Sequence, residues 1–167
     1  RPVGNGSSGR VAAFSSGGLA FDGRVRPDLV APGVGLATDD ARVDPRGRGS
    51  HATATGTSAA AAVTAGAAAL VAQARPELGA RALKAVLVGS AARLGQGVAR
   101  EGAGLVDASA ASTAALAVEP SALAFGRATD KAWSDSRTIT VTNVSRRVVH
   151  LGFASVSDQE RSPFSFT

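Results

Sequence analysis

The longest apolar stretch of the chain lies between Thr57 and Arg75, where small and apolar residues follow one another without a charged side chain. Nearly all of these residues form helices readily, and Pro76 cannot continue a helix. The pattern therefore predicts one helix over residues 57–75. Because it is apolar or small on every side, we expect it to be buried within a larger protein rather than to lie on a surface.

Two further helices are predicted after this stretch. Residues 80–92 place Leu83, Val86 and Leu87 on one side and charged residues on the other, which is typical of an amphipathic helix packed on the outside of the first. Asp107 precedes another helical pattern that runs through Leu116 and is positioned to cap it.

The N-terminal part of the chain predicts short strands joined by loops. Residues 29–31 are apolar and are bounded by Pro27 and Pro32, which is the profile of a brief strand in a sheet covered on both faces. Residues 10–14 alternate like a short strand. Residues 37–55 contain few apolar side chains and are expected to form a loop that returns the chain to the long helix.

The pattern changes after residue 116, where apolar and polar positions alternate with a period of two between turn residues. These runs predict antiparallel strands of a β-sandwich that is incomplete within the chain. They are Val118 and residues 123–126, 137–143 and 148–153. We therefore expect one domain over residues 1–116 and a partial β-sandwich domain over residues 117–167.

Composition narrows the class of protein. The chain has 167 residues and is 44% hydrophobic, which is sufficient for a core, and it lacks cysteine, which excludes disulfides and thiolate metal sites. Its net charge of +5 comes from scattered arginines that are not interleaved with aromatic side chains, so nucleic-acid binding is not favoured. Small polar residues interrupt the apolar stretches, and no membrane-spanning segment is predicted.

The first chemical candidate is Ser58, which stands where the long helix begins. A hydroxyl residue at this position can be an ordinary helix N-cap. It can also be a nucleophile that attacks a carbonyl while its own backbone N–H helps to bind the oxyanion. The helix start alone leaves both interpretations open.

The residues around Ser58 resemble the serine box of the subtilisin-like proteases, or subtilases, whose usual form is Gly-Thr-Ser-Met-Ala-Ala-Pro-His-Val-Ala-Gly. Seven of the eleven positions match over residues 56–66, and these are Gly56, Thr57, Ser58, Ala60, Ala61, Ala65 and Gly66. The departures are Ala59, Ala62, Val63 and Thr64, and none of them removes the nucleophile.

Three more segments resemble subtilase blocks in the family's order. Residues 11–18 are similar to the strand that ends in Phe-Ser-Ser, residues 26–34 to the Pro-Asp-Leu-x-Ala-Pro-Gly block, and residues 102–107 to the closing Gly-x-Gly-x-Val-Asp block. The resemblance implies an α/β fold, the back half of a subtilisin-like parallel-sheet sandwich with a buried serine-bearing helix. The pattern after residue 116 resembles the fibronectin-III-like or immunoglobulin-like modules that follow many bacterial subtilase domains.

The implied function is that of a secreted serine endopeptidase acting on proteins or peptides through an acyl-enzyme on Ser58. The triad aspartate and histidine and the oxyanion asparagine belong upstream in the family, so we expect an upstream catalytic half to supply them and this segment alone to be inactive. No cofactor is expected, although calcium is possible in the full-length protein. The alternative is a non-catalytic pseudoprotease or binding module in which the serine box is only structural.

Other candidate residues are less convincing. His51 lies seven positions before Ser58, but the subtilase order of Asp, His and Ser places the base farther upstream, so a surface role is expected for His51 and also for His150. Asp39, Asp40 and Asp44 lack the alternating ligand spacing of a calcium loop. Residues 4–9 spell G-x-G-x-x-G, but no strand precedes them and no helix follows, so a dinucleotide site is not predicted.

Overall fold

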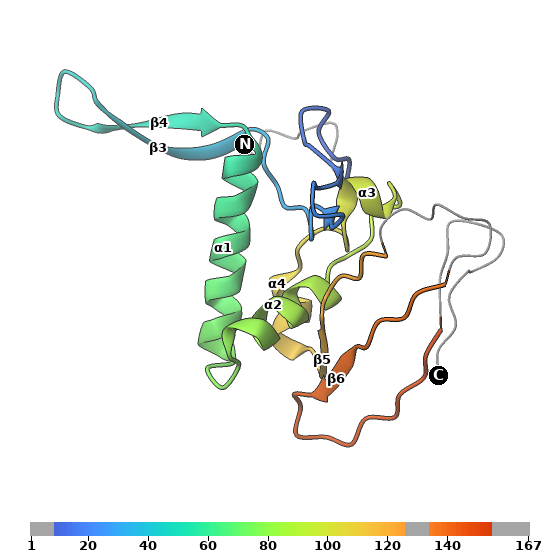
Figure 1. Ribbon diagram of the computed structural model, residues 1–167. Coiled ribbons are helices and arrows are strands. Elements are labelled where there is room, and N and C mark those ends of the chain that lie inside the picture. The colour runs from blue at the N-terminus through green and yellow to red at the C-terminus, as the bar shows by residue number, and fades with distance from the viewer. Residues whose placement is uncertain (1–8, 126–133, 155–167) are drawn as a thin grey trace.

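The computed structural model describes residues 9–125 and 134–154. Within these ranges the strands pair as three two-stranded antiparallel sheets, β1 with β2, β3 with β4 and β5 with β6 (Figure 1). In chain order the elements are β1 (Gly18–Leu19), β2 (Val25–Arg26), β3 (Leu36–Val43), β4 (Gly49–Ala54), α1 (Thr57–Ala74), α2 (Ala80–Gly89), α3 (Val98–Glu101), α4 (Ala108–Thr113), β5 (Leu116–Glu119) and β6 (Thr140–Asn143).

The core is built around α2, which packs against α1, α4 and β5. The predicted amphipathic helix is confirmed, because four consecutive residues from Ala85 to Val88 are buried while Arg81 and Lys84 are exposed. The helix ends at Gly89, before the predicted end at Ala92. The sequence predicts α2 on the outside of α1, whereas α2 forms the centre of the packing in the described chain. The buried cluster consists of Ala67, Val71, Ala85, Val86, Leu87, Ala111 and Ala117.

Helix α1 confirms the predicted helix, yet this chain buries very little of it. Ala67 and Val71 are its buried residues, and Figure 1 shows the helix at one side of the molecule. Most of α1 is thus exposed in the described chain, and its burial within a larger protein stays a prediction. By length and composition alone α1 could cross a membrane, but core helices of soluble proteins meet the same criterion.

The predicted buried strand over residues 29–31 is reduced to one bridge, in which Val30 pairs in parallel with Leu105. The Val30 N–H donates to the Gly104 carbonyl at 2.9 Å, and the Val106 N–H donates to the Val30 carbonyl at 2.8 Å. Two subtilase-like blocks that are far apart in the sequence thus lie side by side. This bridge is the parallel pairing present in the described residues, and the full parallel-sheet sandwich stays a prediction.

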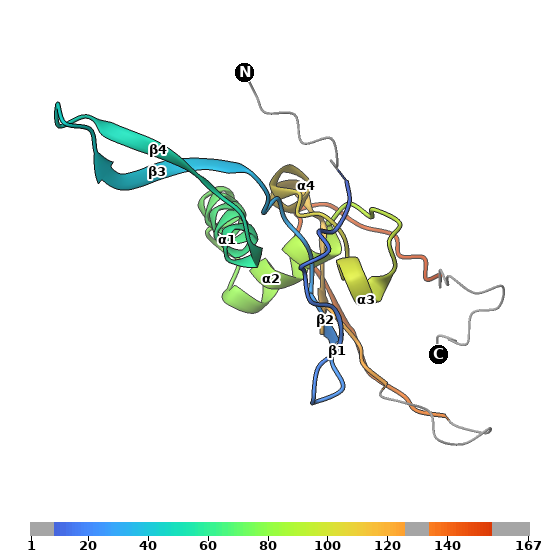
Figure 2. The same ribbon diagram turned by 90° about the horizontal axis from the view of Figure 1, so that it is seen from above.

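Two local predictions for the N-terminal part are wrong. Residues 10–14 form no strand, and the chain turns there, with the Ser15 N–H donating to the Ala12 carbonyl at 3.0 Å. Residues 37–55 are not a loop, because β3 and β4 form an antiparallel hairpin that extends away from the helices (Figure 2).

The turn of this hairpin explains how a polar segment forms strands. The Asp44 carboxylate accepts the N–H groups of Arg46 and Arg48 at 2.8 and 2.9 Å, and Gly47 adopts a φ of 76° that suits glycine. These contacts reverse the chain, so backbone hydrogen bonds can form between two strands that carry little apolar signal.

Among the described residues of the C-terminal part, one antiparallel strand pair is present, and the β-sandwich stays a prediction. Strand β5 pairs with β6, which confirms strands near Val118 and within residues 137–143. Residues 123–125 and 148–153 form no strands, contrary to the prediction, and Gly126 lies outside the described residues. Asp107 caps α4 as predicted, since its carboxylate accepts the Ala110 N–H at 2.8 Å, but α4 ends at Thr113 and Leu116 begins β5.

Glu101 is a buried carboxylate that no pattern in the sequence predicts. It is 1% exposed and accepts the N–H groups of Leu94 at 2.9 Å and Gln96 at 3.3 Å. We expect Glu101→Ala to lower the free energy of unfolding by about 2 kcal/mol, because these N–H groups lose a charged acceptor. Glu101→Gln keeps an acceptor oxygen and should lose less. Urea unfolding measures both, and equal stability of all three proteins would contradict the assignment.

Asp28 lies between Arg26 at 2.6 Å and Lys84 at 2.8 Å, with its side chain 25% exposed. Burial raises the pKa of this carboxyl, but hydrogen bonds and charges from Lys84 and Arg26 outweigh it, so the pKa lies below the ordinary 3.8. A lowered folded-state pKa means that the stabilisation is complete above the ordinary pKa and is lost as the pH falls through the folded value.

We therefore expect Lys84→Met to destabilise the protein at neutral pH, by less than about 1 kcal/mol because Lys84 is half exposed. The difference from the parent protein should shrink at a second, acidic pH below the folded-state pKa of Asp28, because the carboxyl is then protonated in both proteins. Urea unfolding at the two pH values measures this. Arg81→Met, an exposed position on the same helix, is the control, and a pH-independent loss would contradict the role of Asp28.

Candidate active site

Ser58 lies in the first turn of α1 and its side chain is exposed. The helix N-cap is Gly56, and no side chain caps the helix. Neither Thr57 nor Ser58 therefore acts as a cap, which removes the ordinary structural explanation for a hydroxyl at this position. The hydroxyl of Ser58 is left at the surface of the described chain, at the N-terminus of the apolar helix.

The start of α1 is held by the segment that follows the 29–31 bridge. The Gly56 N–H donates to the Gly33 carbonyl at 2.7 Å, and the Gly35 N–H donates to the Thr55 hydroxyl at 2.9 Å. A Cβ atom on Gly33 would lie 2.8 Å from the Gly56 carbonyl oxygen and 3.0 Å from the Ala60 Cβ. Only glycine fits this contact, so the Pro-Gly of one sequence block fixes the position of the serine box.

The backbone at Ser58 is suited to bind negative charge. The N–H groups of Ala59 and Ala60 donate to the Gly56 carbonyl at 3.1 and 3.3 Å. The Ser58 N–H comes before them in the first turn, where N–H groups have no acceptor within the helix. The aligned peptide dipoles add a partial positive charge there, and the helix carries no charged side chain before Arg75. An oxyanion next to Ser58 would therefore find a donor and a favourable potential.

The described residues do not bring a base to Ser58. His51 lies on β4 opposite Asp39 of β3, and its Nδ1 is 3.2 Å from the Asp39 carboxylate. Both side chains are more than 80% exposed, and no hydrogen bond joins this pair to Ser58 in the part of the chain that the structure describes. His150 is also exposed. Both histidines therefore occupy the surface positions that the sequence predicts.

The acidic residues of the hairpin pair with arginines. Asp40 contacts Arg42 at 2.7 Å and Asp44 contacts Arg48 at 3.0 Å. The hydrogen bond from the Arg42 side chain is the main reason that the pKa of Asp40 lies below its usual value. Within residues 9–125 and 134–154, no group of three His, Cys, Asp or Glu residues is arranged to hold a metal ion.

Comparison with known protein families identifies the family of this chain. The model of the subtilase family matches residues 3–118. The chain belongs to the subtilase family. The match includes the serine box, the 26–34 block and the 102–107 block, and it ends within β5. No curated protein matches the chain.

Some residues that shape this subtilase site were not identified from the sequence. Gly33 lies in the 26–34 block, but its contact with the start of α1 could not be predicted from the sequence. Thr55 gave no signal, because a threonine before a glycine is common and its bond to Gly35 joins residues 20 positions apart. Ser58 is the candidate that the sequence offers, because seven of the eleven positions of the subtilase box match over residues 56–66.

Proposed function

We propose that this subtilase chain carries the nucleophile of a serine endopeptidase and that Ser58 is that nucleophile. The observation that carries the proposal is the exposed Ser58 hydroxyl at the N-terminus of α1, in a helix whose cap is Gly56. A serine that does not cap its helix, stands beside a free helix N-terminus and lies in a subtilase box has the position that acyl transfer requires.

In the proposed reaction the Ser58 oxygen attacks the carbonyl carbon of a peptide while a base takes the hydroxyl proton. The carbonyl oxygen becomes an oxyanion, which accepts a hydrogen bond from the Ser58 N–H. Collapse of this intermediate breaks the C–N bond, and the protonated base returns its proton to the leaving amine. Water then attacks the acyl-enzyme ester with help from the same base, which releases the acid and restores Ser58.

The base, its aspartate and the second oxyanion donor are proposed to come from an upstream catalytic half, in the same gene product or in a partner fragment. The large exposed apolar surface of α1 supports this partner. The helix is apolar throughout, yet Ala67 and Val71 are its buried residues, so most of its apolar surface is available for packing against further chain. We therefore propose that the chain alone does not hydrolyse peptides.

A fluorophosphonate serine probe tests these proposals. The intact gene product should become labelled at Ser58 rapidly and stoichiometrically, and the isolated 167-residue chain should not. Rapid labelling of the isolated chain would show that the chain contains its own base. Absence of labelling in the intact protein would overturn the protease proposal in favour of a pseudoprotease or binding module.

We extend two further family features to this chain. Subtilases are commonly secreted, so we propose an extracellular location, and the presence of the protein in the culture medium of the source cell tests it. We also propose that residues 117–167 begin a fibronectin-III-like or immunoglobulin-like module, which the antiparallel β5–β6 pair supports. No cofactor is required by the proposed chemistry.

A further inference from the structure

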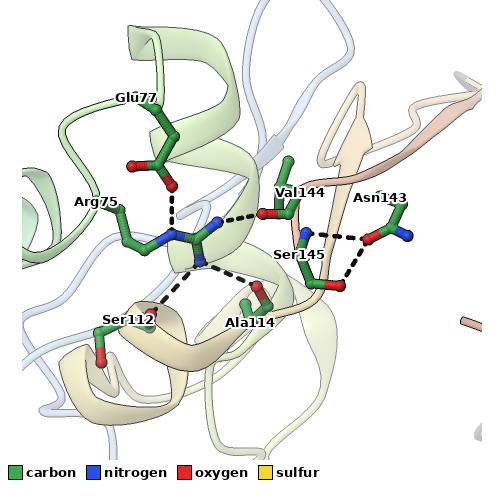
Figure 3. A network of polar contacts seen from close by, with 7 residues as sticks. All are labelled: Arg75, Glu77, Ser112, Ala114, Asn143, Val144 and Ser145. Atoms are coloured by element: carbon green, nitrogen blue, oxygen red, sulfur yellow. Dashed lines mark hydrogen bonds and ion pairs between the residues drawn. The ribbon is translucent and has the colours of Figure 1, made fainter. Parts of the chain in front are cut away.

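Arg75 is a largely buried arginine that joins three separate parts of the chain. It directly follows α1, and its side chain is 15% exposed. Its guanidinium donates to the carbonyls of Ala114 at 3.1 Å, Ser112 at 3.4 Å and Val144, and to the Glu77 carboxylate at 2.6 Å (Figure 3). The planar group thus binds the end of α4 and the residue that follows β6. Few side chains other than arginine could contact so many acceptors at once.

The segment that Arg75 binds also pairs with the core. Strand β6 is antiparallel to β5, with Val141 opposite Val118, and the Val144 N–H donates to the Ala115 carbonyl at 2.9 Å. On β5, Ala117 is 1% exposed within the main buried cluster, and Val144 packs against the same cluster. The segment therefore covers the core of the family-matched region, although it lies 22 residues or more beyond the end of the match, since β6 begins at residue 140 and the match ends at residue 118.

A local turn holds the end of this segment. The Asn143 side-chain oxygen accepts the N–H of Ser145 at 2.9 Å and its hydroxyl at 2.8 Å (Figure 3). The Asn143 amide also donates to the Arg147 carbonyl at 2.8 Å. Such a turn satisfies polar groups locally and sets the direction of the chain. It fixes the Val144 carbonyl that Arg75 contacts.

We propose that residues 140–145, the C-terminal strap, lock the C-terminal end of the serine-bearing helix α1 through Arg75. The strap, α4 and the end of α1 then form one cooperative unit. If the strap leaves, the guanidinium loses an acceptor in a poorly hydrated position, and Ala117 and its neighbours lose their cover. Residues 140–145 lie outside the residues that match the family, yet they stabilise the fold of the matched residues. The cooperativity of the strap, α4 and the end of α1 does not depend on whether Ser58 is catalytic.

Hydrogen–deuterium exchange of the intact gene product tests the strap from both ends. Arg75→Ala should accelerate exchange at the Val144 amide and in the last turn of α1 by at least about tenfold. Val144→Pro removes the N–H that bonds to Ala115 and should accelerate exchange in the last turn of α1, which residue 144 reaches through the bond of its carbonyl to Arg75 and through the buried cluster that contains Val71. Arg75→Lys keeps the charge without the planar fork and should give a smaller increase.

Arg81→Ala, at an exposed position of α2, is the matched control and should leave both segments unchanged. The proposed role of the strap is overturned if Arg75→Ala accelerates exchange no more than Arg81→Ala does. It is also overturned if Val144→Pro affects residues near position 144 while the last turn of α1 keeps its parental protection. In either case the two segments would open independently.

Discussion

Replacing Ser58 with alanine in the intact protein is expected to abolish peptide hydrolysis. The loss in kcat should be on the order of 10⁶-fold, which is the known size of the effect in subtilisin itself. The physical reason is that, in the proposed mechanism, this hydroxyl oxygen forms the covalent bond to the substrate. Because the hydroxyl is exposed and does not cap the helix, its removal should leave the free energy of unfolding nearly unchanged.

The matched control is Thr64→Ala, which removes another hydroxyl from the same helix. The Thr64 hydroxyl donates to the Ala60 carbonyl at 2.9 Å within the helix, so its removal should change kcat little. Hydrolysis of a fluorogenic peptide measures kcat, and thermal unfolding verifies that both variants fold. Activity of Ser58→Ala within tenfold of the parent would show that Ser58 is not the nucleophile.

Replacing Gly104 with alanine is expected to give a large loss of stability, about 4 kcal/mol of unfolding free energy. The added Cβ would lie 2.3 Å from the Ala92 carbonyl oxygen and 2.6 Å from its carbon, and Gly104 has a φ of 127°. Both the clash with backbone and the backbone conformation oppose any side chain. The Gly104 carbonyl also accepts the Val30 N–H, so the parallel bridge would be disturbed.

The Gly104→Ala substitution should also disturb the start of α1 at the candidate active site. Residues 30–33 lead from the bridge to the Gly33 carbonyl, which accepts the Gly56 N–H at the start of α1. Gly89→Ala is the control, because no atom lies within 4 Å of its Cβ position and it stands at the end of a helix. Urea unfolding followed by circular dichroism measures both. Equal stability of Gly104→Ala and the parent would contradict the close approach of these backbones.

The sequence by itself determined the elements whose signal is local. The apolar run before Pro76 gave α1 to within one residue of its predicted end, and the spacing of Leu83, Val86 and Leu87 identified the buried side of α2. Asp107 was identified as a cap from its position alone. The box around Ser58 indicated the subtilase family. In each of these cases the information lies within a few consecutive residues or one helical turn.

Features that depend on contacts between distant segments could be seen only in the tertiary structure. The hairpin of β3 and β4 lacks an apolar pattern and is formed by backbone pairing and the Asp44 turn. The run at residues 29–31 pairs, among the described residues, through one bridge between Val30 and Leu105. The exposure of α1 and the burial of Arg75 followed neither from hydrophobicity nor from charge. Burial is set by which segments cover a residue, and the carbonyls that Arg75 contacts lie up to 69 positions away in the sequence.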